Sequence, residues 1–512
     1  MLIGLLCVAV ALGAAEFAAA FVRAQAAPVI AVGGAAIDLT PEWLKSFAIR
    51  TFGEHDKQVL LGGLVLGLAV FAALLGLAAG RSRALGSLGV AALGLVGAVA
   101  AFTRPGGGLT DVVPALLGTV AGEVALLLLL RTAPTPARAR GADDAQHGAA
   151  HRKGGHRADG RREFLLAAGG VAAVAAAGGS LGRVLAGRRS VAEARRAVRL
   201  PTPVGRAAPV PVGADLRIPG LSPFVTPNAD FYRVDTALTL PQVDPADWTL
   251  RVHGMVDRPV ELTFAELLRR PLVERDITLA CVSNQVGGPY VGHARWLGVL
   301  LADLLREAGP RAGADQLLSR SADGWTCGTP LQVVLDGRDA LLAVGMNGEP
   351  LPIAHGFPVR MVVPGLYGYV SATKWLVDLE VTRYRDHRAY WTARGWATDA
   401  PIKTMARIEV PRPLRPVRSG RIAVAGVAWA QHRGVAAVQV RVDGGPWRQA
   451  RLAPVPGADT WRQWVLEWDA PPGTHRLEVR AVDARGAVQP QKRVPPYPDG
   501  ATGWHSIVVT VE

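Results

Sequence analysis

The chain has 512 residues, half of them hydrophobic, and a formal net charge of +14. That length exceeds one domain and suffices for more than one hydrophobic core. Many basic residues cluster between Arg131 and Arg206, beside apolar segments and without an aromatic stripe, which excludes nucleic acid as the expected partner.

Four segments are long and apolar enough to cross a bilayer, which takes about 20 residues. They are residues 2–21, 59–80, 84–102 and 112–130, so region 1–130 is predicted to hold four transmembrane helices. Arg81, Arg83 and the Arg/His-rich linker 131–162 lie on one side, which the positive-inside rule makes cytoplasmic. We expect an amphipathic stretch over 41–57, with Trp43, on the opposite surface.

Two carboxylates, Glu16 and Glu123, lie within these spans, where a charge is costly. We interpret them as protonated or paired residues at helix contacts. The spans contain no histidine, which argues against a haem held by two histidines in this part of the chain.

A fifth apolar segment, 163–186, follows Arg161 and Arg162. Paired arginines before a moderately hydrophobic Ala/Gly-rich span resemble a twin-arginine translocation signal, and an ordinary fifth transmembrane helix is the alternative. Either interpretation predicts a multi-pass protein of the cell membrane whose later part faces outside the cytoplasm. No small-x-small cleavage site follows, so the helix is expected to remain as an anchor.

The remaining chain divides by composition. Residues 187–214 are rich in Arg, Pro, Ala and Val and are predicted to form an extended linker. Region 215–406 mixes short apolar runs with a few amphipathic helices, which indicates an α+β domain. Within it we expect helices at 263–269, capped by Thr263, and at 296–308, and strands at 353–363 and 374–381.

Region 407–512 lacks helical patterns. Strands are predicted at 421–430, 436–442, 464–468, 475–482 and 506–511, with turns at 443–446 and 471–473. Several short strands at this spacing favour an immunoglobulin-like β-sandwich.

The chemistry of the chain centres on Cys281, one of three cysteines. It ends a short apolar run and precedes a glycine-rich loop at 286–289. A lone thiolate at a strand end can be a nucleophile or a soft metal ligand, and a disulfide with Cys327 is the structural alternative. Cys7 and Cys327 are otherwise expected to be small buried residues.

A second group of residues predicts an anion site. His355, Arg360 and Lys374 are embedded in apolar runs, where a solvated basic surface is a poor explanation. Arginine binds phosphate through two donors and lysine adds a point charge.

Together with Cys281 and Asn284, these residues resemble the sulfite oxidase family of molybdenum enzymes. The resemblance extends over residues 222–512 and includes Gly-His-Ala-Arg-Trp at 292–296, Met-Asn-Gly-Glu-Pro-Leu-Pro at 346–352 and His-Gly-Phe-Pro-Val-Arg at 355–360. It implies an oxidoreductase that transfers an oxygen atom at a molybdenum-molybdopterin cofactor, with Cys281 as the metal ligand. It also implies a terminal sandwich of the kind this family uses to form homodimers.

The resemblance assigns roles to further residues. Catalysis would involve Cys281, Arg233 and Gln285. The residues expected to bind the cofactor are Tyr232, Arg233, Asn284, His355, Arg360, Ser371, Thr373 and Lys374.

The chain departs from the family at positions that meet the substrate. Gln285 and Val286 stand where arginines bind the oxyanion, and Val234 and Asp235 replace an asparagine and a histidine. Sulfite is therefore a doubtful substrate, and a neutral S-oxide, N-oxide or similar small molecule is equally compatible with the site. No haem domain is apparent in this chain, so a separate electron-transfer partner is implied.

The alternative hypothesis is a non-catalytic surface protein that uses the sandwich for adhesion or assembly. It predicts a Cys281–Cys327 disulfide and no cofactor.

Overall fold

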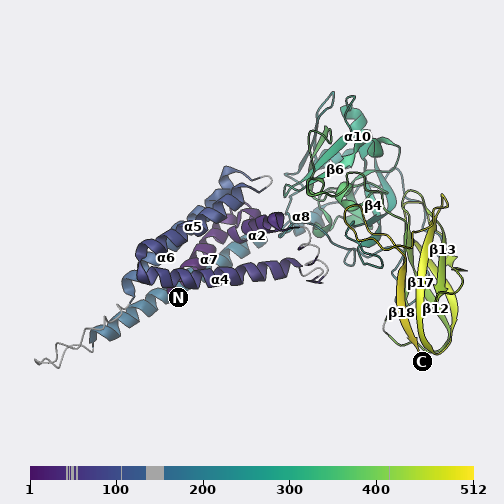
Figure 1. Ribbon diagram of the computed structural model, residues 1–512. Coiled ribbons are helices and arrows are strands. Elements are labelled where there is room, and N and C mark those ends of the chain that lie inside the picture. The colour runs from purple at the N-terminus through teal and green to yellow at the C-terminus, as the bar shows by residue number, and fades with distance from the viewer. Residues whose placement is uncertain are drawn as a thin grey trace, which may run out of the picture. The chain divides into compact units, whose positions relative to one another are not determined.

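The computed structural model describes residues 1–41, 44, 47, 51–52, 56–104, 107–133, 155–188, 190–413 and 415–512. The chain divides into two compact units, Met1–Ser190 with Ala237–Leu240 and Val191–Thr236 with Pro241–Glu512 (Figure 1). Of the sequence predictions, most of the amphipathic stretch 41–57, including Trp43, and the central part of the Arg/His-rich linker lie outside the described residues.

The first unit is helical. Its helices are α1 (Leu2–Ala19), α2 (Pro28–Leu39), α4 (Asp56–Arg81), α5 (Arg83–Phe102), α6 (Val113–Thr132) and α7 (Gly155–Arg188), with short 3-10 turns η1 (Ala24–Ala26) and η3 (Leu109–Val112). Helix α1 packs against α4, α6 and α7, and α5 lies against α4 and α6. Helix α2 was not predicted, because its 12 residues are too few to span a bilayer.

Five helical segments of the described chain are long and apolar enough to cross a membrane. They are Leu2–Ala19, Lys57–Arg81, Arg83–Phe102, Leu109–Thr132 and Arg162–Gly182. Their positions agree with the five apolar spans that the sequence predicts. Insertion into a membrane, its orientation and recognition of the paired arginines stay predictions.

Small residues and a few polar contacts hold these helices together. A Cβ at Gly4 of α1 would lie 1.9 Å from the carbonyl oxygen of Ala72 in α4, so only glycine permits this close approach. Ser87 of α5 donates a hydrogen bond to the Glu123 carboxylate of α6 at 2.5 Å. Glu123 therefore bridges two helices, as the helix-contact interpretation expected.

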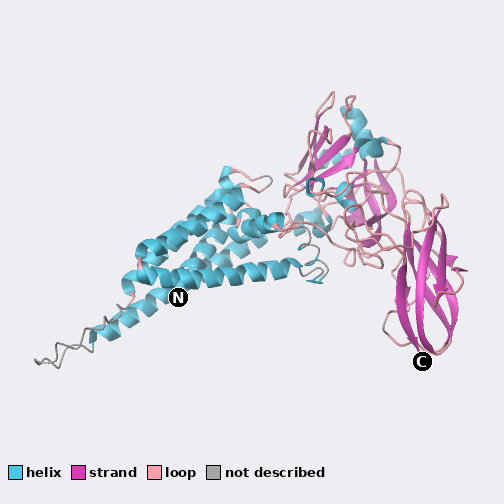
Figure 2. Ribbon diagram, in the orientation of Figure 1, coloured by secondary structure: helices cyan, strands magenta, loops and turns pink. Residues whose placement is uncertain are grey.

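The second unit begins with a mixed region of sheets and short helices, drawn largely as magenta strands and pink loops in Figure 2. Strands β1 (Thr249–Gly254), β2 (Val260–Thr263), β5 (Gln316–Ser321), β6 (Thr326–Pro330) and β10 (Leu376–Thr382) form one sheet in the order β2-β1-β10-β5-β6. Strands β3 (Leu272–Ala280), β4 (Val291–Leu300), β7 (Leu341–Met346) and β8 (Glu349–Pro350) form another, and β9 (Arg360–Val362) pairs with β7. Only β1 and β10 pair in parallel among these strands, which agrees with an α+β region.

Short helices connect these strands. They are α8 (Ala192–Ala197), α9 (Phe264–Arg269), α10 (Leu301–Ala308) and α11 (Leu331–Leu335), with 3-10 turns η4 (Ile353–His355), η5 (Gly368–Val370) and η6 (Thr392–Arg394). Helix α9 is confirmed together with its cap, because the Glu266 amide donates to Thr263 Oγ1.

Three local predictions were wrong. The helix expected at 296–308 starts only at Leu301, because Trp296–Leu300 belongs to β4, a strand buried between β3 and β7 whose apolar run continues into the helix without a turn residue. The strand expected at 353–363 begins only at Arg360, since residues 353–355 form η4. The expected linker 187–214 contains α8.

The C-terminal part consists of two antiparallel sheets around a common core. Their orders are β11-β12-β16-β15 and β14-β13-β17-β18. The strands are β11 (Met405–Val410), β12 (Gly420–Trp429), β13 (Val435–Val442), β14 (Arg448–Gln449), β15 (Arg451–Leu452), β16 (Arg462–Ala470), β17 (Gly473–Asp483) and β18 (His505–Val511). Residues from both sheets, such as Val424, Trp464, Val479 and Val509, share one hydrophobic cluster. All five predicted strands are confirmed, and the immunoglobulin-like assignment stays a prediction.

Candidate active site

Cys281 follows directly after β3, where a tight loop at 282–290 leads into β4. The Cys281 amide donates to the Tyr290 carbonyl at 2.9 Å, and Asn284 Oδ1 accepts from the Tyr290 amide at 2.9 Å. The bond between Cys281 and Tyr290 therefore joins the ends of this loop, and Asn284 ties its first turn to Tyr290. Its predicted contact with a cofactor stays a prediction.

The Cys281 thiol is half-buried at this strand end. Burial raises its pKa, whereas hydrogen bonds from Ser283 and the nearby Lys374 ammonium lower it. The Ser283 amide lies 3.4 Å from the sulfur as a donor. Gln285, predicted to be catalytic, is exposed on the same loop, four residues after the thiol.

Four basic side chains gather around Lys374, which is close enough to Cys281 to lower the pKa of its thiol. This basic cluster consists of Arg233, His355, Arg360 and Lys374. His355 ends η4, Arg360 opens β9, and Lys374 precedes β10, so rigid elements carry three of the four. Burial, together with the charges of Arg360, Lys374 and Arg233, lowers the pKa of the His355 imidazole to about 4. The structure thus brings together the three residues of the predicted anion site.

Arg360 is the most enclosed cation of the basic cluster. Its Nη1 donates to the His355 carbonyl at 3.1 Å, and its guanidinium lies 5.0 Å from the ring centroid of Trp296. Burial lowers its pKa to about 10, so it stays charged at pH 7. Its Nε is buried without a hydrogen-bond partner. A buried donor without a partner requires an explanation, and an absent ligand is one.

A carboxylate joins two members of the basic cluster. Asp235 Oδ2 accepts from Lys374 Nζ at 2.6 Å and from Arg233 Nε at 2.9 Å. Burial lowers the pKa of Lys374 to about 8, and Asp235 acts in the opposite direction. Sequence reasoning recorded Asp235 only as a departure from the family. Because Asp235 lies two residues after Arg233, the sequence could have suggested an ion pair between them.

Tyr232 connects the thiol with the basic cluster. It stacks on Phe231 with 5.2 Å between ring centroids. Burial raises the pKa of its hydroxyl, with a further increase from Cys281 and a decrease from Arg360. The phenol therefore lies close enough to interact electrostatically with Cys281 and with Arg360.

Two predicted cofactor-binding hydroxyls make contacts within the protein. Ser371 Oγ donates to the carbonyls of Leu366 and Tyr367, both at 3.0 Å. Thr373 Oγ1 lies 2.7 Å from Ser319 Oγ. Both residues are completely buried. Their role toward a cofactor stays a prediction.

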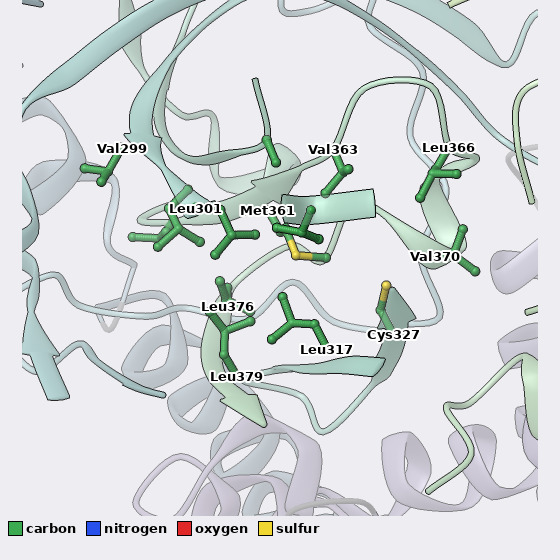
Figure 3. Close-up of a cluster of buried hydrophobic side chains, with 14 of the residues drawn as sticks. Val299, Leu301, Leu317, Cys327, Met361, Val363, Leu366, Val370, Leu376 and Leu379 are labelled. Carbon is green, nitrogen blue, oxygen red and sulfur yellow. The ribbon is translucent and has the colours of Figure 1, made fainter. Parts of the chain in front are cut away.

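Cys327 lies in the hydrophobic core. It is fully buried in a cluster that includes Leu317, Val370 and Leu376 (Figure 3). All three cysteines of the chain are free, so the Cys281–Cys327 disulfide that the adhesion hypothesis predicts is absent.

The C-terminal sheets contact the loop after Cys281. Arg407 Nη1 of β11 donates to the Gly288 carbonyl at 2.5 Å, and Glu409 holds this arginine through Nε at 2.9 Å. Gly287 has φ +79°, and a Cβ there would lie 2.3 Å from the His505 Nε2 of β18. Sequence reasoning missed these contacts, because no local pattern links residues so far apart.

The residues present fit a molybdenum-molybdopterin cofactor. The described residues contain no group of three or more His, Cys, Asp or Glu side chains able to hold a metal ion. A metal bound by the soft Cys281 sulfur would therefore take its other ligands from a cofactor. The basic cluster, including the unpartnered Arg360 Nε, supplies charge and donors for the anionic part of such a group.

Comparisons with known proteins agree with this interpretation. The family model described as "Oxidoreductase molybdopterin binding domain" matches residues 237–391. Sulfite oxidase of Gallus gallus is 32% identical over 334 residues, covering 55% of this chain and 72% of the relative. Mitochondrial sulfite oxidase of Homo sapiens is 31% identical, covering 56% and 62%.

Two bacterial proteins extend the comparison. The uncharacterized oxidoreductase YuiH of Bacillus subtilis is 35% identical over 153 residues, which cover 30% of this chain and 74% of the relative. The solved structure of the sulfane dehydrogenase SoxCD from Paracoccus pantotrophus is 26% identical, with a TM-score of 0.48, covering 56% of this chain and 84% of that chain. On its similarity to the sulfite oxidases, the chain belongs to the sulfite oxidase family of molybdopterin-dependent oxidoreductases.

Proposed function

We propose that this enzyme is anchored in the cell membrane and transfers oxygen atoms to or from a small molecule outside the cytoplasm. One observation carries the proposal: a half-buried, free cysteine at a strand end lies near Lys374 of a largely buried basic cluster. A soft ligand next to an anion site is what a metal bound to a phosphorylated organic cofactor requires.

The residues have distinct proposed roles. Cys281 binds molybdenum, and His355, Arg360 and Lys374 hold the cofactor phosphate, with Tyr232 between them. Arg233, the most exposed of the basic cluster with 38% of its side chain accessible, faces the substrate. Asn284 shapes the loop that carries the candidate catalytic Gln285.

Molybdenum-molybdopterin, when bound, supplies two-electron oxygen-atom transfer. In the oxidising direction a substrate X and water give XO, two protons and two electrons. Each turnover releases one pair of electrons. The proposal therefore requires a separate electron-transfer partner that accepts them. Sulfite is a doubtful X, since Gln285 and Val286 carry no charge.

Further parts of the proposal concern location and assembly. The five apolar helices support a multi-pass membrane protein, and the arginines flanking them support an outward-facing catalytic unit. The two C-terminal sheets are compatible with an immunoglobulin-like sandwich that forms a homodimer, as the family resemblance implies.

The decisive experiment is metal and pterin analysis of the full chain, expressed in a cell that makes the cofactor. We expect about one molybdenum per chain in the wild type, as a single ligand thiol implies, and a lower molybdenum content in Cys281→Ser, which loses the proposed protein ligand. The matched control is Cys327→Ser, which alters a core thiol and should keep the metal. A folded wild-type protein without molybdenum would refute the proposal.

A further inference from the structure

Asp235 is the counter-ion of the two cations at the edge of the basic cluster. Its Oδ2 pairs with Lys374 and Arg233, and its Oδ1 lies 3.4 Å from a second nitrogen of the Arg233 guanidinium. Only 6% of its side chain is exposed, so water screens these contacts poorly. The carboxylate therefore occupies two donor positions of Arg233.

Arg233 is the member of the basic cluster best placed to meet a solute. Its side chain is 38% exposed, against 10% for Lys374, while His355 and Arg360 are buried. An oxyanion entering from solvent would meet this guanidinium first. The Nε donor of Arg233 is already bound to the Asp235 carboxylate, whose negative charge repels an oxyanion.

The charge balance of the site points the same way. Because burial brings the pKa of His355 to about 4, its imidazole is neutral at pH 7. The remaining charged groups are three cations, Arg233, Arg360 and Lys374, and the Asp235 carboxylate. Together they carry a net charge of about +2. A phosphate monoester carries about −1.5 to −2 at this pH. A cofactor phosphate would cancel the positive charge and leave none for an anionic substrate.

We propose that Asp235 determines substrate specificity, by cancelling the charge of Arg233 and fitting the site to an uncharged oxygen donor or acceptor rather than to an oxyanion. This inference rests on the proposed function, because it assigns the buried cations to the cofactor phosphate. A dianion placed near Asp235 would suffer repulsion that an uncharged molecule does not.

The test compares Asp235→Asn with the wild type in the molybdenum-loaded full chain. Sulfate, an unreactive oxyanion, is titrated by isothermal calorimetry, and sulfite-dependent reduction of ferricyanide is measured in parallel. We expect at least about tenfold tighter sulfate binding in Asp235→Asn, since it removes the repelling charge and frees a guanidinium donor. The KM for sulfite should fall in the same proportion.

Two variants serve as controls. Asp235→Glu keeps the charge and should behave as the wild type toward sulfate. Asp247→Asn removes one negative charge from an exposed position of the same unit and should leave sulfate binding unchanged. An equal gain in sulfate affinity in Asp235→Asn and Asp247→Asn would indicate a general charge effect and overturn the role of Asp235.

Two other outcomes would overturn the inference. Sulfate binding by the wild type as tight as by Asp235→Asn would show that the carboxylate does not discriminate. Loss of molybdenum from Asp235→Asn alone would make Asp235 a cofactor-holding residue. Absence of molybdenum from the wild type instead contradicts the proposed function, and metal analysis of each preparation separates the two failures.

Discussion

Replacing Arg407 with alanine tests how firmly the C-terminal sheets hold the loop after Cys281. The side chains of Arg407 and Glu409 are each 10% exposed, and the pair also reaches the Gly288 carbonyl. Removing one partner of a buried pair leaves an uncompensated charge, which costs about 3–5 kcal/mol. Glu409 keeps hydrogen bonds from the amide and hydroxyl of Ser222, at 2.7 and 2.9 Å. We therefore expect the lower end of that range, about 3 kcal/mol.

Urea unfolding followed by tryptophan fluorescence measures this loss. Every tryptophan except Trp43 lies in the second unit, so the signal reports on that unit. The double variant Arg407→Ala/Glu409→Ala should lose less stability than Arg407→Ala, because it buries no lone charge. In cofactor-free protein, the Cys281 thiol should also react faster with a thiol reagent once the loop is released.

The matched control is Arg451→Ala, which removes an exposed arginine from β15 of the same sheet. Surface substitutions of this kind change the free energy of unfolding by about 0.5 kcal/mol or less. If Arg407→Ala were no more destabilising than this control, or if the double variant were the less stable one, the reasoning about a buried pair would be refuted.

Three further predictions concern the same unit. Calorimetric binding of sulfate, which stays a dianion over this range, to the cofactor-free protein should be constant from pH 5 to 7. It should weaken as pH rises through about 8, where Lys374 loses its proton. Stronger binding toward pH 5 would contradict the neutral state of His355. Burial lowers the pKa of His293 from 6.5 to about 4, so the unfolded state binds its proton first and stability should fall as pH decreases from 6.5 to 4. Urea unfolding at pH 4.5 and 7 should show a smaller decrease for His293→Gln, and an equal decrease would argue against this residue. Gly287→Ala should lower the free energy of unfolding by about 1–3 kcal/mol, because the new methyl group meets the His505 ring at a positive φ; wild-type stability would show that the loop adapts freely.

Long apolar segments and local capping could be predicted from the sequence. The five membrane-length helices follow from runs of apolar residues that no soluble element needs. Thr263 indicated the start of α9, because an N-cap residue lies within one turn of the groups it caps, and the structure adds Glu266 as the second half of the cap. The strands of the C-terminal sheets were equally accessible, since turn residues separate them.

Periodicity failed where burial is complete. Strand β4 lies in the interior of its sheet between β3 and β7, and eight of its ten residues are buried, so the strand shows no alternation of buried and exposed positions. The run then continues into α10 without Gly or Pro between them. A continuous apolar segment of this kind cannot be divided between strand and helix by its sequence alone.

The candidate site was predictable in its residue types and not in its contacts. His355, Arg360 and Lys374 lie within 20 positions of each other, and their apolar surroundings indicated an anion site. The pairing of Lys374 with Asp235 spans 139 positions, and that of Arg407 with Gly288 spans 119. Such contacts depend on how the sheets are stacked, which no local pattern encodes.

The two thiols of the catalytic unit differ in how they meet oxidants. Cys327 is fully enclosed by the core, whereas Cys281 is only partly buried at the strand end. Solvent access governs how readily a thiol is converted to sulfenic acid and beyond. In a chain exported as we propose, a bare Cys281 would be open to irreversible oxidation at the proposed metal ligand. If the unit is exported as we propose, binding of the cofactor at Cys281 in a reducing compartment before export would protect this sulfur.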